Sequence, residues 1–326
     1  MPQMTPSQAR VIDPILTEVA RGFVSVGTPV ADILFPRVQV GQRGGKIISF
    51  GPDDYRLYNT ARAPGAATKR VRYGYASGDF ALVDYSLEGE VPIELQQEAE
   101  TVPGIDMGAG AVNSVRTAQA IEREKQASDL ALDPGAYTSG NKQALAAGYR
   151  WDDDGGDPAR DVNIGKETIR SQIGVRPNVL IAGPKSISAL RNNPKLLARL
   201  SITEMRTPAT LAQLALLLEV EQVIEASAVY HDGTKFVDMW GAAAILAYTK
   251  PASLSARGSP NYGYTYQLAE YPYAEDPYFE RNTKTWYYPV TDARQVVLVG
   301  PAAGFLFMNT ASAAQQFFGA AAVANA

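Results

Sequence analysis

The chain lacks cysteine, and it has a single histidine, His231, among its 326 residues. Without cysteine it forms no disulfide bond and offers no thiolate as a nucleophile or metal ligand. One histidine cannot build a histidine-bearing transition-metal cluster. His231 begins the sequence His-Asp-Gly, which is typical of a tight turn between strands, so an exposed turn residue is favoured over a catalytic base. The sequence therefore excludes thiol chemistry and disfavours a histidine-dependent triad.

The chain also lacks a surplus of basic residues and a long apolar run. Its net charge of -4 and pI near 5.3 give no overall basic field for tight binding to nucleic acid through many phosphate contacts. Its apolar stretches are shorter than the ~20 residues of a membrane helix, and its N-terminus does not have the pattern of a secretory signal. We therefore expect no membrane partner. With 46% hydrophobic residues, the chain can form more than one packed region.

The stretch WDDDGGDPARDV, residues 151–162, has the acidic character of a metal site. The pattern of a calcium loop, started at Asp152, fails at the third ligand, at the glycine and at the final glutamate. By contrast, Asp157-Pro158 is typical of a helix start, with a solvated acidic loop before it and Trp151 as its anchor. The apolar stripe that follows predicts one helix with these landmarks: Val162, Ile169, Ile173 and a stop at Gly174.

Two glycine-containing stretches fail as nucleotide sites. Gly183-Pro184-Lys185-Ser186 has proline where a phosphate-binding loop needs glycine before the lysine, and Gly108-Ala109-Gly110 lacks the third glycine of a dinucleotide fingerprint. Scattered Asp and Glu residues leave a carboxylate-based hydrolase open, because their separation in space is not visible in the sequence. We predict no catalytic, cofactor-binding or metal-binding residue.

Strand and helix patterns occur in separate runs, which favours an α+β fold. Near the N-terminus, Ile15, Val19 and Phe23 predict the apolar face of a short helix in an otherwise extended arm. Residues 110–133 are rich in helix formers and predict a long helix that stops at Pro134. Further predicted elements are a strand in NVLIAG, a helix broken at Pro194, a helix that starts at Thr207-Pro208, and strands in QVIEASAVY, KFVDMW, AAAILAY, YGYTYQL, KTWYYPV, RQVVLVG and GFLFMN.

Two groups of residues are predicted to contact neighbouring subunits. The glycine-rich middle of a long hairpin-like loop has few apolar residues for a core of its own, and its basic residues are candidates for pairing with acidic neighbours: Arg62, Lys69, Arg70 and Arg72. Alternating tyrosines would line one strand face, and tyrosine is favoured at interfaces: Tyr262, Tyr264 and Tyr266. Stacking on sugars or bases is the alternative for the tyrosines.

The order of these parts resembles the major capsid proteins of tailed bacteriophages, which have the Hong Kong 97-type coat fold. Residues 13–40, DPILTEVARGFVSVGTPVADILFPRVQV, look like the N-terminal arm, and YNTARAPGAATKRV with YSLEGEVPI looks like the extended E-loop. The helix with EKQASDL resembles the long spine helix. PNVLIAGP and ALRNNPKLLARL, within residues 177–200, are similar to a segment that recurs in these proteins.

The resemblance implies the division of the chain. We expect an N-terminal arm (1–37), an E-loop (38–95), a peripheral (P) domain (96–178 and 250–297) that contains the spine helix (110–133), and an axial (A) domain (179–249 and 298–326).

The resemblance also implies the function: a structural protein without catalysis that assembles in the host cytoplasm. Hexamers and pentamers would form the icosahedral head of the virion around double-stranded DNA, without sequence-specific binding. Scaffold, portal and decoration proteins are possible partners. An encapsulin-like bacterial compartment shell is the alternative with a similar fold.

Overall fold

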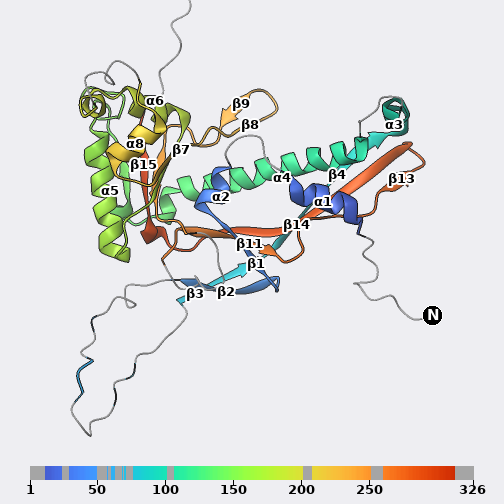
Figure 1. The fold of residues 1–326 in the computed structure, drawn as a ribbon, viewed down its shortest axis with the longest axis horizontal. Coiled ribbons are helices and arrows are strands. Elements are labelled where there is room, and N and C mark those ends of the chain that lie inside the picture. The colour runs from blue at the N-terminus through green and yellow to red at the C-terminus, as the bar shows by residue number, and fades with distance from the viewer. Residues whose placement is uncertain are drawn as a thin grey trace, which may run out of the picture.

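A 26-residue helix, α4 (Met107–Leu132), lies along a six-stranded sheet, which extends to the right of a second, smaller lobe (Figure 1). The computed structural model describes residues 12–23, 29–49, 57, 60–62, 68, 70, 76–100, 106–200, 208–250 and 260–312. The long helix predicted over residues 110–133 is confirmed. It begins three residues earlier because the Asp106 carboxylate accepts a hydrogen bond from Ala109 N, which caps the first turn.

The six-stranded sheet is organised around one long central strand. Its strands are β1 (Arg37–Val40), β4 (Val83–Pro92), β11 (Gly263–Leu268), β12 (Tyr273–Ala274), β13 (Tyr278–Glu280) and β14 (Thr285–Leu298). β14 pairs antiparallel with β4 over ten residues, although about 200 residues of sequence separate the two strands. The predicted strands KTWYYPV and RQVVLVG are therefore one continuous strand. Pro289 lies within it and accepts a hydrogen bond from Glu275 N through its carbonyl.

In its described residues, the smaller lobe consists of a five-stranded sheet and four α-helices. Its strands, in spatial order, are β5 (Lys142–Ala144), β15 (Gly304–Met308), β10 (Ala244–Ala247), β6 (Val179–Ala182) and β7 (Gln222–Glu225). Its helices are α5 (Pro158–Ile173), α6 (Pro184–Asn192), α7 (Pro194–Leu197) and α8 (Leu211–Leu218). β6, β10 and most of β15 are buried on both faces, which explains their continuous apolar sequences.

Helix α5 confirms the predicted landmarks. Asp157 caps its first turn through Arg160 N, and Gly174 ends it with a φ of 69°, a left-handed conformation that favours glycine. Trp151 is fully buried, and its Nε1 donates to the Asp161 carboxylate at 3.0 Å, so this ring anchors the helix as predicted. By contrast, α8 starts at Leu211 and not at Thr207-Pro208, because Thr210 and Gln213 form a capping box.

The described part of the N-terminal arm contains two helices, α1 (Pro14–Gly22) and α2 (Val30–Leu34), both packed against α4. The predicted apolar face of the first helix is confirmed for Val19, which packs against the buried cluster beside α4, and is wrong for Ile15. Ile15 is 75% exposed, whereas Leu16 and Ala20 are buried beside α4 and β12. The second helix replaces part of the predicted extended arm.

Two hairpins and one short helix complete the described elements. β2 (Gly44–Ser49) pairs with β3 (Ala76–Ala81), β8 (Val229–His231) pairs with β9 (Phe236–Asp238), and α3 (Ile93–Glu100) follows β4. His231 is exposed at the β8–β9 turn, where its Nδ1 accepts from Gly233 N, as the turn prediction required. QVIEASAVY is split between β7 and β8. Short 3-10 turns occupy Pro134–Ala136, Ser139–Asn141 and Pro301–Ala303, and no helix of the described ranges has the length and apolar composition to cross a membrane.

Candidate assembly surfaces

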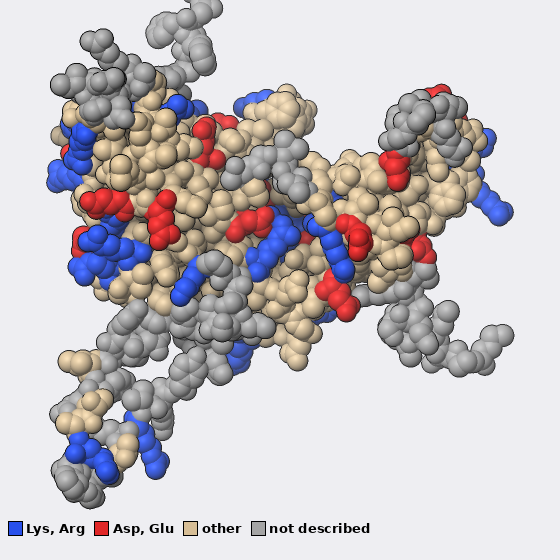
Figure 2. All heavy atoms as spheres, viewed as in Figure 1, with Lys and Arg blue, Asp and Glu red and all other residues tan. Residues whose placement is uncertain are grey.

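The predicted basic contact residues lie in the segment between β2 and β3. Arg62 and Arg70 are exposed, while Lys69 and Arg72 lie outside the described residues. Figure 2 shows basic side chains on this segment, well away from the two sheets. Exposed guanidinium groups in this position are accessible to acidic groups of a neighbouring subunit, as the predicted pairing requires.

The three predicted tyrosines are buried inside their own chain. Tyr262 has no accessible surface; its ring packs against Phe35 with centroids 5.4 Å apart, and its hydroxyl bonds to that of Tyr137. Burial is the main cause that raises the pKa of Tyr262 well above its usual value. Tyr264 and Tyr266 are buried in a different cluster, where Tyr266 stacks on Phe80 of β3 with centroids 4.5 Å apart.

The tyrosine prediction is therefore corrected: the rings use their surface to join parts of one chain. Tyr262 binds the arm and the smaller lobe to β11, and Tyr264 and Tyr266 hold the β2–β3 hairpin. The alternation of tyrosine was a valid strand signal. It could not reveal that both faces of β11 are covered by segments far away in the same sequence.

The large apolar side chains that stay exposed are distributed around the molecule. On β4, Val83 and Leu87 are half exposed, and β4 pairs only with β14 in the part of the chain that the structure describes, so one of its edges is unpaired. At the β8–β9 hairpin, Phe236 is 74% exposed. Leu216 on α8 and Ile15 on α1 are also exposed. Single exposed apolar side chains are ordinary on a soluble chain, so the unpaired edge of β4, with Val83 and Leu87 on the same strand, is the stronger candidate contact with other copies.

Aspartates of the acidic loop accept hydrogen bonds from backbone N–H groups of the smaller lobe. The Asp153 carboxylate accepts from Gly148 N and Arg150 N, and the Asp152 carboxylate accepts from Ser312 N at 2.8 Å. Among the described residues, no group of three or more His, Asp or Glu side chains is arranged to hold a metal ion. The aspartates therefore act as caps and loop braces.

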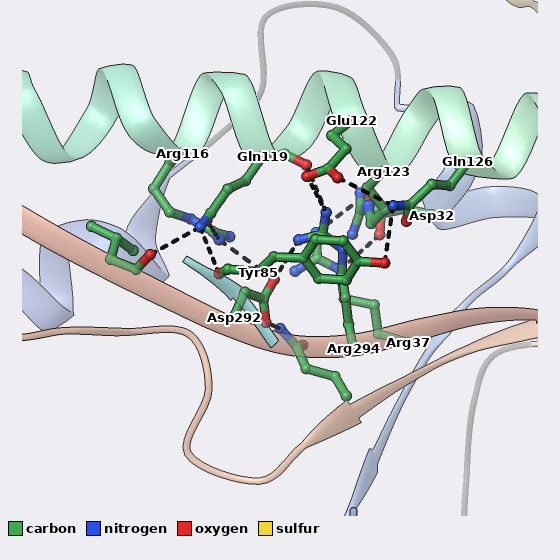
Figure 3. A network of polar contacts seen from close by, with 12 residues as sticks. Asp32, Arg37, Tyr85, Arg116, Gln119, Glu122, Arg123, Gln126, Asp292 and Arg294 are labelled. Carbon is green, nitrogen blue, oxygen red and sulfur yellow. Dashed lines mark hydrogen bonds and ion pairs between the residues drawn. The ribbon is translucent and has the colours of Figure 1, made fainter. Parts of the chain in front are cut away.

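A polar network joins the arm, α4 and β14 (Figure 3). Arg123 on α4 donates to Asp32 of α2 at 2.8 Å, and Arg294 on β14 donates to Asp292 at 3.0 Å. Gln119 donates to the carbonyls of Tyr85 and Val290, which connects α4 to both β4 and β14. This network was missed from the sequence. The signal was present on α4, where Arg116, Gln119 and Arg123 at i, i+3 and i+7 form a polar stripe on one helix face.

Nearby arginines favour the charged form of Asp32 and Asp292. Burial by itself raises the pKa of Asp292, but Arg294, Gln267 and Arg116 together hold it below its usual value. Asp32 shows the same balance, with Arg123 and Arg37 outweighing its burial, so its pKa is also lowered. Burial raises the pKa of the nearby Glu124, whose carboxylate accepts from Ala31 N and from Trp240 Nε1.

Comparison with known proteins identifies the family. No family model matches the sequence. The chain is 32% identical to the major capsid protein of Burkholderia phage BcepMu, over 92% of this chain and 97% of that protein. It belongs to the family of phage major capsid proteins. The major capsid protein of Pseudomonas phage JBD67 is 26% identical to this coat protein over 66% of the chain and 69% of that relative.

Solved structures agree with the fold of this coat protein. A phage-related protein of Bordetella bronchiseptica RB50 is 40% identical, with a TM-score of 0.79 and coverage of 93% of this chain and 98% of that one. The capsid protein of cyanophage P-SCSP1u is 10% identical with a TM-score of 0.53, over 88% and 90% of the two chains. The coat protein thus has the predicted α+β, Hong Kong 97-type fold.

The encapsulin alternative is not favoured. The SrpI encapsulin of Synechococcus elongatus PCC 7942 has a TM-score of 0.52 over 95% of this chain and 92% of its own, but its identity is 13%, so this likeness concerns the fold alone. As a phage major capsid protein, the chain is a structural component of the virion and assembles into an oligomeric shell.

Proposed function

We propose that this coat protein forms hexamers and pentamers that close into the icosahedral head of a tailed phage around double-stranded DNA. The observation that carries the proposal is the 32% identity that extends over 97% of a phage major capsid protein. The exposed β4 edge and the apolar side chains Leu87 and Phe236 add support, because repeated contacts around symmetry axes would cover them. The net charge of -4 suits an enclosure that holds DNA without sequence-specific binding.

The proposed role is structural, without catalysis, and assembly takes place in the host cytoplasm. Scaffold, portal and decoration proteins are its proposed partners. For the chain itself, we propose an arm (1–37), an E-loop (38–95), a P-domain and an A-domain. Because α5 packs on β15 and β10, we place the first boundary between the P-domain and the A-domain after residue 133 and not after residue 178. The proposed P-domain then consists of residues 96–133 and 250–297, and the A-domain of residues 134–249 and 298–326.

The experiment that tests the proposed contents starts from particles purified from infected or induced host cells. Nuclease is applied before and after the particles are opened, and the released material is analysed for DNA and for protein cargo. The proposal expects long double-stranded DNA that is protected until the particles open. Shells filled with an enzyme cargo would overturn it in favour of a bacterial compartment, and a catalytically active monomer would overturn it in favour of a hydrolase.

We also propose that the basic E-loop residues pair with acidic groups on adjacent subunits. Exposed pairs contribute ~0.2 to 1 kcal/mol each, so four of them modulate assembly while apolar burial provides most of its free energy. The test reverses four charges together: Arg62, Lys69, Arg70 and Arg72 to Glu. A matched control reverses four exposed basic residues of the smaller lobe: Arg160, Arg170, Arg176 and Lys185.

Light scattering at low and high salt follows assembly of both variants. The proposal expects that the loop variant assembles more slowly at low salt than the control variant, and that high salt narrows the difference. Equal assembly of the two variants at low salt would contradict the proposed pairing.

A further inference from the structure

A cavity of about 180 Å³ lies where the arm meets α4 and β14, and four arginine side chains line it. Arg116 and Arg123 come from α4, Arg294 from β14 and Arg37 from β1. Figure 3 shows these guanidinium groups converging from different elements on a shared space beneath the helix. Chain segments about 260 residues apart in sequence therefore bring positive charge to one point.

Two buried or partly buried carboxylates face the four arginines, and both already accept hydrogen bonds from side chains of the same chain. The Asp292 oxygens accept from Gln267 and Arg294, and Arg116 lies 3.6 Å away. The Asp32 oxygens accept from Arg37 and Arg123 at 2.9 and 2.8 Å. A third acid, Glu122, stands at the edge, 48% exposed and 3.6 Å from Arg294. The residues that line the cavity carry four positive and two negative charges, while Glu122 and Glu124 act on Arg294 and Arg123 from outside the lining.

The guanidinium groups also keep donors that no described group satisfies. The Nε atoms of Arg116, Arg123 and Arg294 have no hydrogen-bond partner among the described residues, but they are buried and closed to the cavity, so a ligand there would meet the terminal NH groups of these arginines. Buried donors without a partner cost free energy, and buried charge of one sign costs more. Burial, followed by repulsion from Arg37, Arg294 and Arg123, lowers the pKa of Arg116 to about 10 even though Asp292 acts in the opposite direction.

We propose that this cavity binds one oxyanion, either a free phosphate-type ion or the carboxylate end of a side chain from a second copy of the chain. Planar guanidinium groups recognise oxyanions through paired N–H donors, and they do so most strongly where water is excluded. The entry lies beside Arg37, which is 39% exposed and also lines a larger groove with Arg21 and Gln267. The size of the cavity suits a single ion or side-chain end. The proposal rests on the single chain and not on the architecture of the shell.

Inorganic phosphate is the probe, and the full chain is titrated as dissociated subunits and as assembled shells. Calorimetry and the midpoint of thermal unfolding are measured against sodium chloride of equal ionic strength. The substitution Arg37→Gln removes the accessible guanidinium at the entry, and Arg43→Gln is the matched control. Arg43 is an exposed arginine that pairs with Asp84 on another part of the molecule.

The site predicts saturable phosphate binding to the subunits, a higher thermal midpoint than in chloride, and a dissociation constant at least about tenfold weaker in Arg37→Gln but unchanged in Arg43→Gln. If a carboxylate of a second copy occupies the site in the shell, assembled shells will not bind phosphate, and phosphate will slow assembly. If a free ion occupies it, shells and subunits will bind phosphate alike. Subunits that respond to phosphate no more than to chloride would overturn the proposal, whatever the variants do.

Discussion

Replacing Phe80 by alanine is expected to detach the β2–β3 hairpin from the six-stranded sheet without unfolding the chain. The Phe80 ring stacks on Tyr266 with centroids 4.5 Å apart and planes 12° from parallel. It also covers Gly45 so closely that a Cβ there would lie 2.9 Å from the ring. The hairpin has few other apolar anchors, since its cluster contains six buried residues: Val38, Val40, Ile47, Phe80, Tyr264 and Tyr266.

The magnitude follows from this small cluster. Truncating a buried phenylalanine to alanine costs roughly 3 to 5 kcal/mol. The main cores of both lobes do not include Phe80, so the loss falls on the docking of the hairpin and not on global stability. A loss of about 3 kcal/mol corresponds to an increase of roughly a hundredfold in the population of the detached hairpin. Because this hairpin lies at the base of the proposed E-loop, detachment should also reduce the yield of closed shells.

Hydrogen exchange measured by mass spectrometry checks the expectation. Amide exchange in β2 and β3 should become roughly a hundredfold faster, while exchange in α4 and β14 stays unchanged. Phe279→Ala is the matched control, because Phe279 packs on Trp286 in a different antiparallel strand pair, β13 and β14. Unchanged exchange in β2 and β3, or equal acceleration over the whole chain, would refute the inference that Phe80 fixes the hairpin locally.

Three further predictions concern stability. Asp157→Ala should lower the free energy of unfolding by about 0.5 to 2 kcal/mol because α5 loses its N-cap, and chemical denaturation should show Asp157→Asn to be close to wild type. Gly174→Ala should lower the free energy of unfolding by about 1 to 2 kcal/mol, because φ is 69° at this position. The same change at Gly22, which has open space around its Cβ position, should not strain the backbone. Thermal unfolding of the two variants checks the difference. The contribution of Asp292 is present above its unfolded pKa near 3.8 and is lost as the pH falls through its lower folded value. Denaturation from pH 5 to 2 should therefore show a weaker pH dependence in Asp292→Asn, and an identical slope would contradict the lowered pKa.

Local signals were enough to predict several elements. The bounds of α5 depend on three local signals: the cap Asp157, Pro158 in the first turn and Gly174 at the end. All three act through neighbouring backbone groups, so the sequence alone is enough to predict this helix. The long helix was predictable for the same reason, since residues 118–132 are mostly strong helix formers and no proline occurs in the helix before Pro134. The order of these parts then allowed the coat fold to be recognised.

Features that depend on distant partners were not predictable. Leu16 and Ile15 are equally apolar, and only the position of α4 decides that Leu16 is buried. The patterns KTWYYPV and RQVVLVG predict two strands with residues 291–293 between them, but β14 is continuous because β4 pairs with it across that gap. Tyr262 is buried by Phe35 and Tyr137, from segments more than 100 residues away. The charge network has the same origin, because Arg37, Arg123 and Arg294 meet only in the folded chain.

The central inference is that this coat protein closes into an icosahedral shell of hexamers and pentamers. Electron cryo-microscopy of the purified, assembled full chain tests it most directly. We expect uniform closed shells with fivefold and sixfold clusters, in which density of neighbouring copies covers the β4 edge and Phe236. Particles without fivefold and sixfold clusters, or only monomers and dimers under conditions in which the related phage coat proteins assemble, would contradict it.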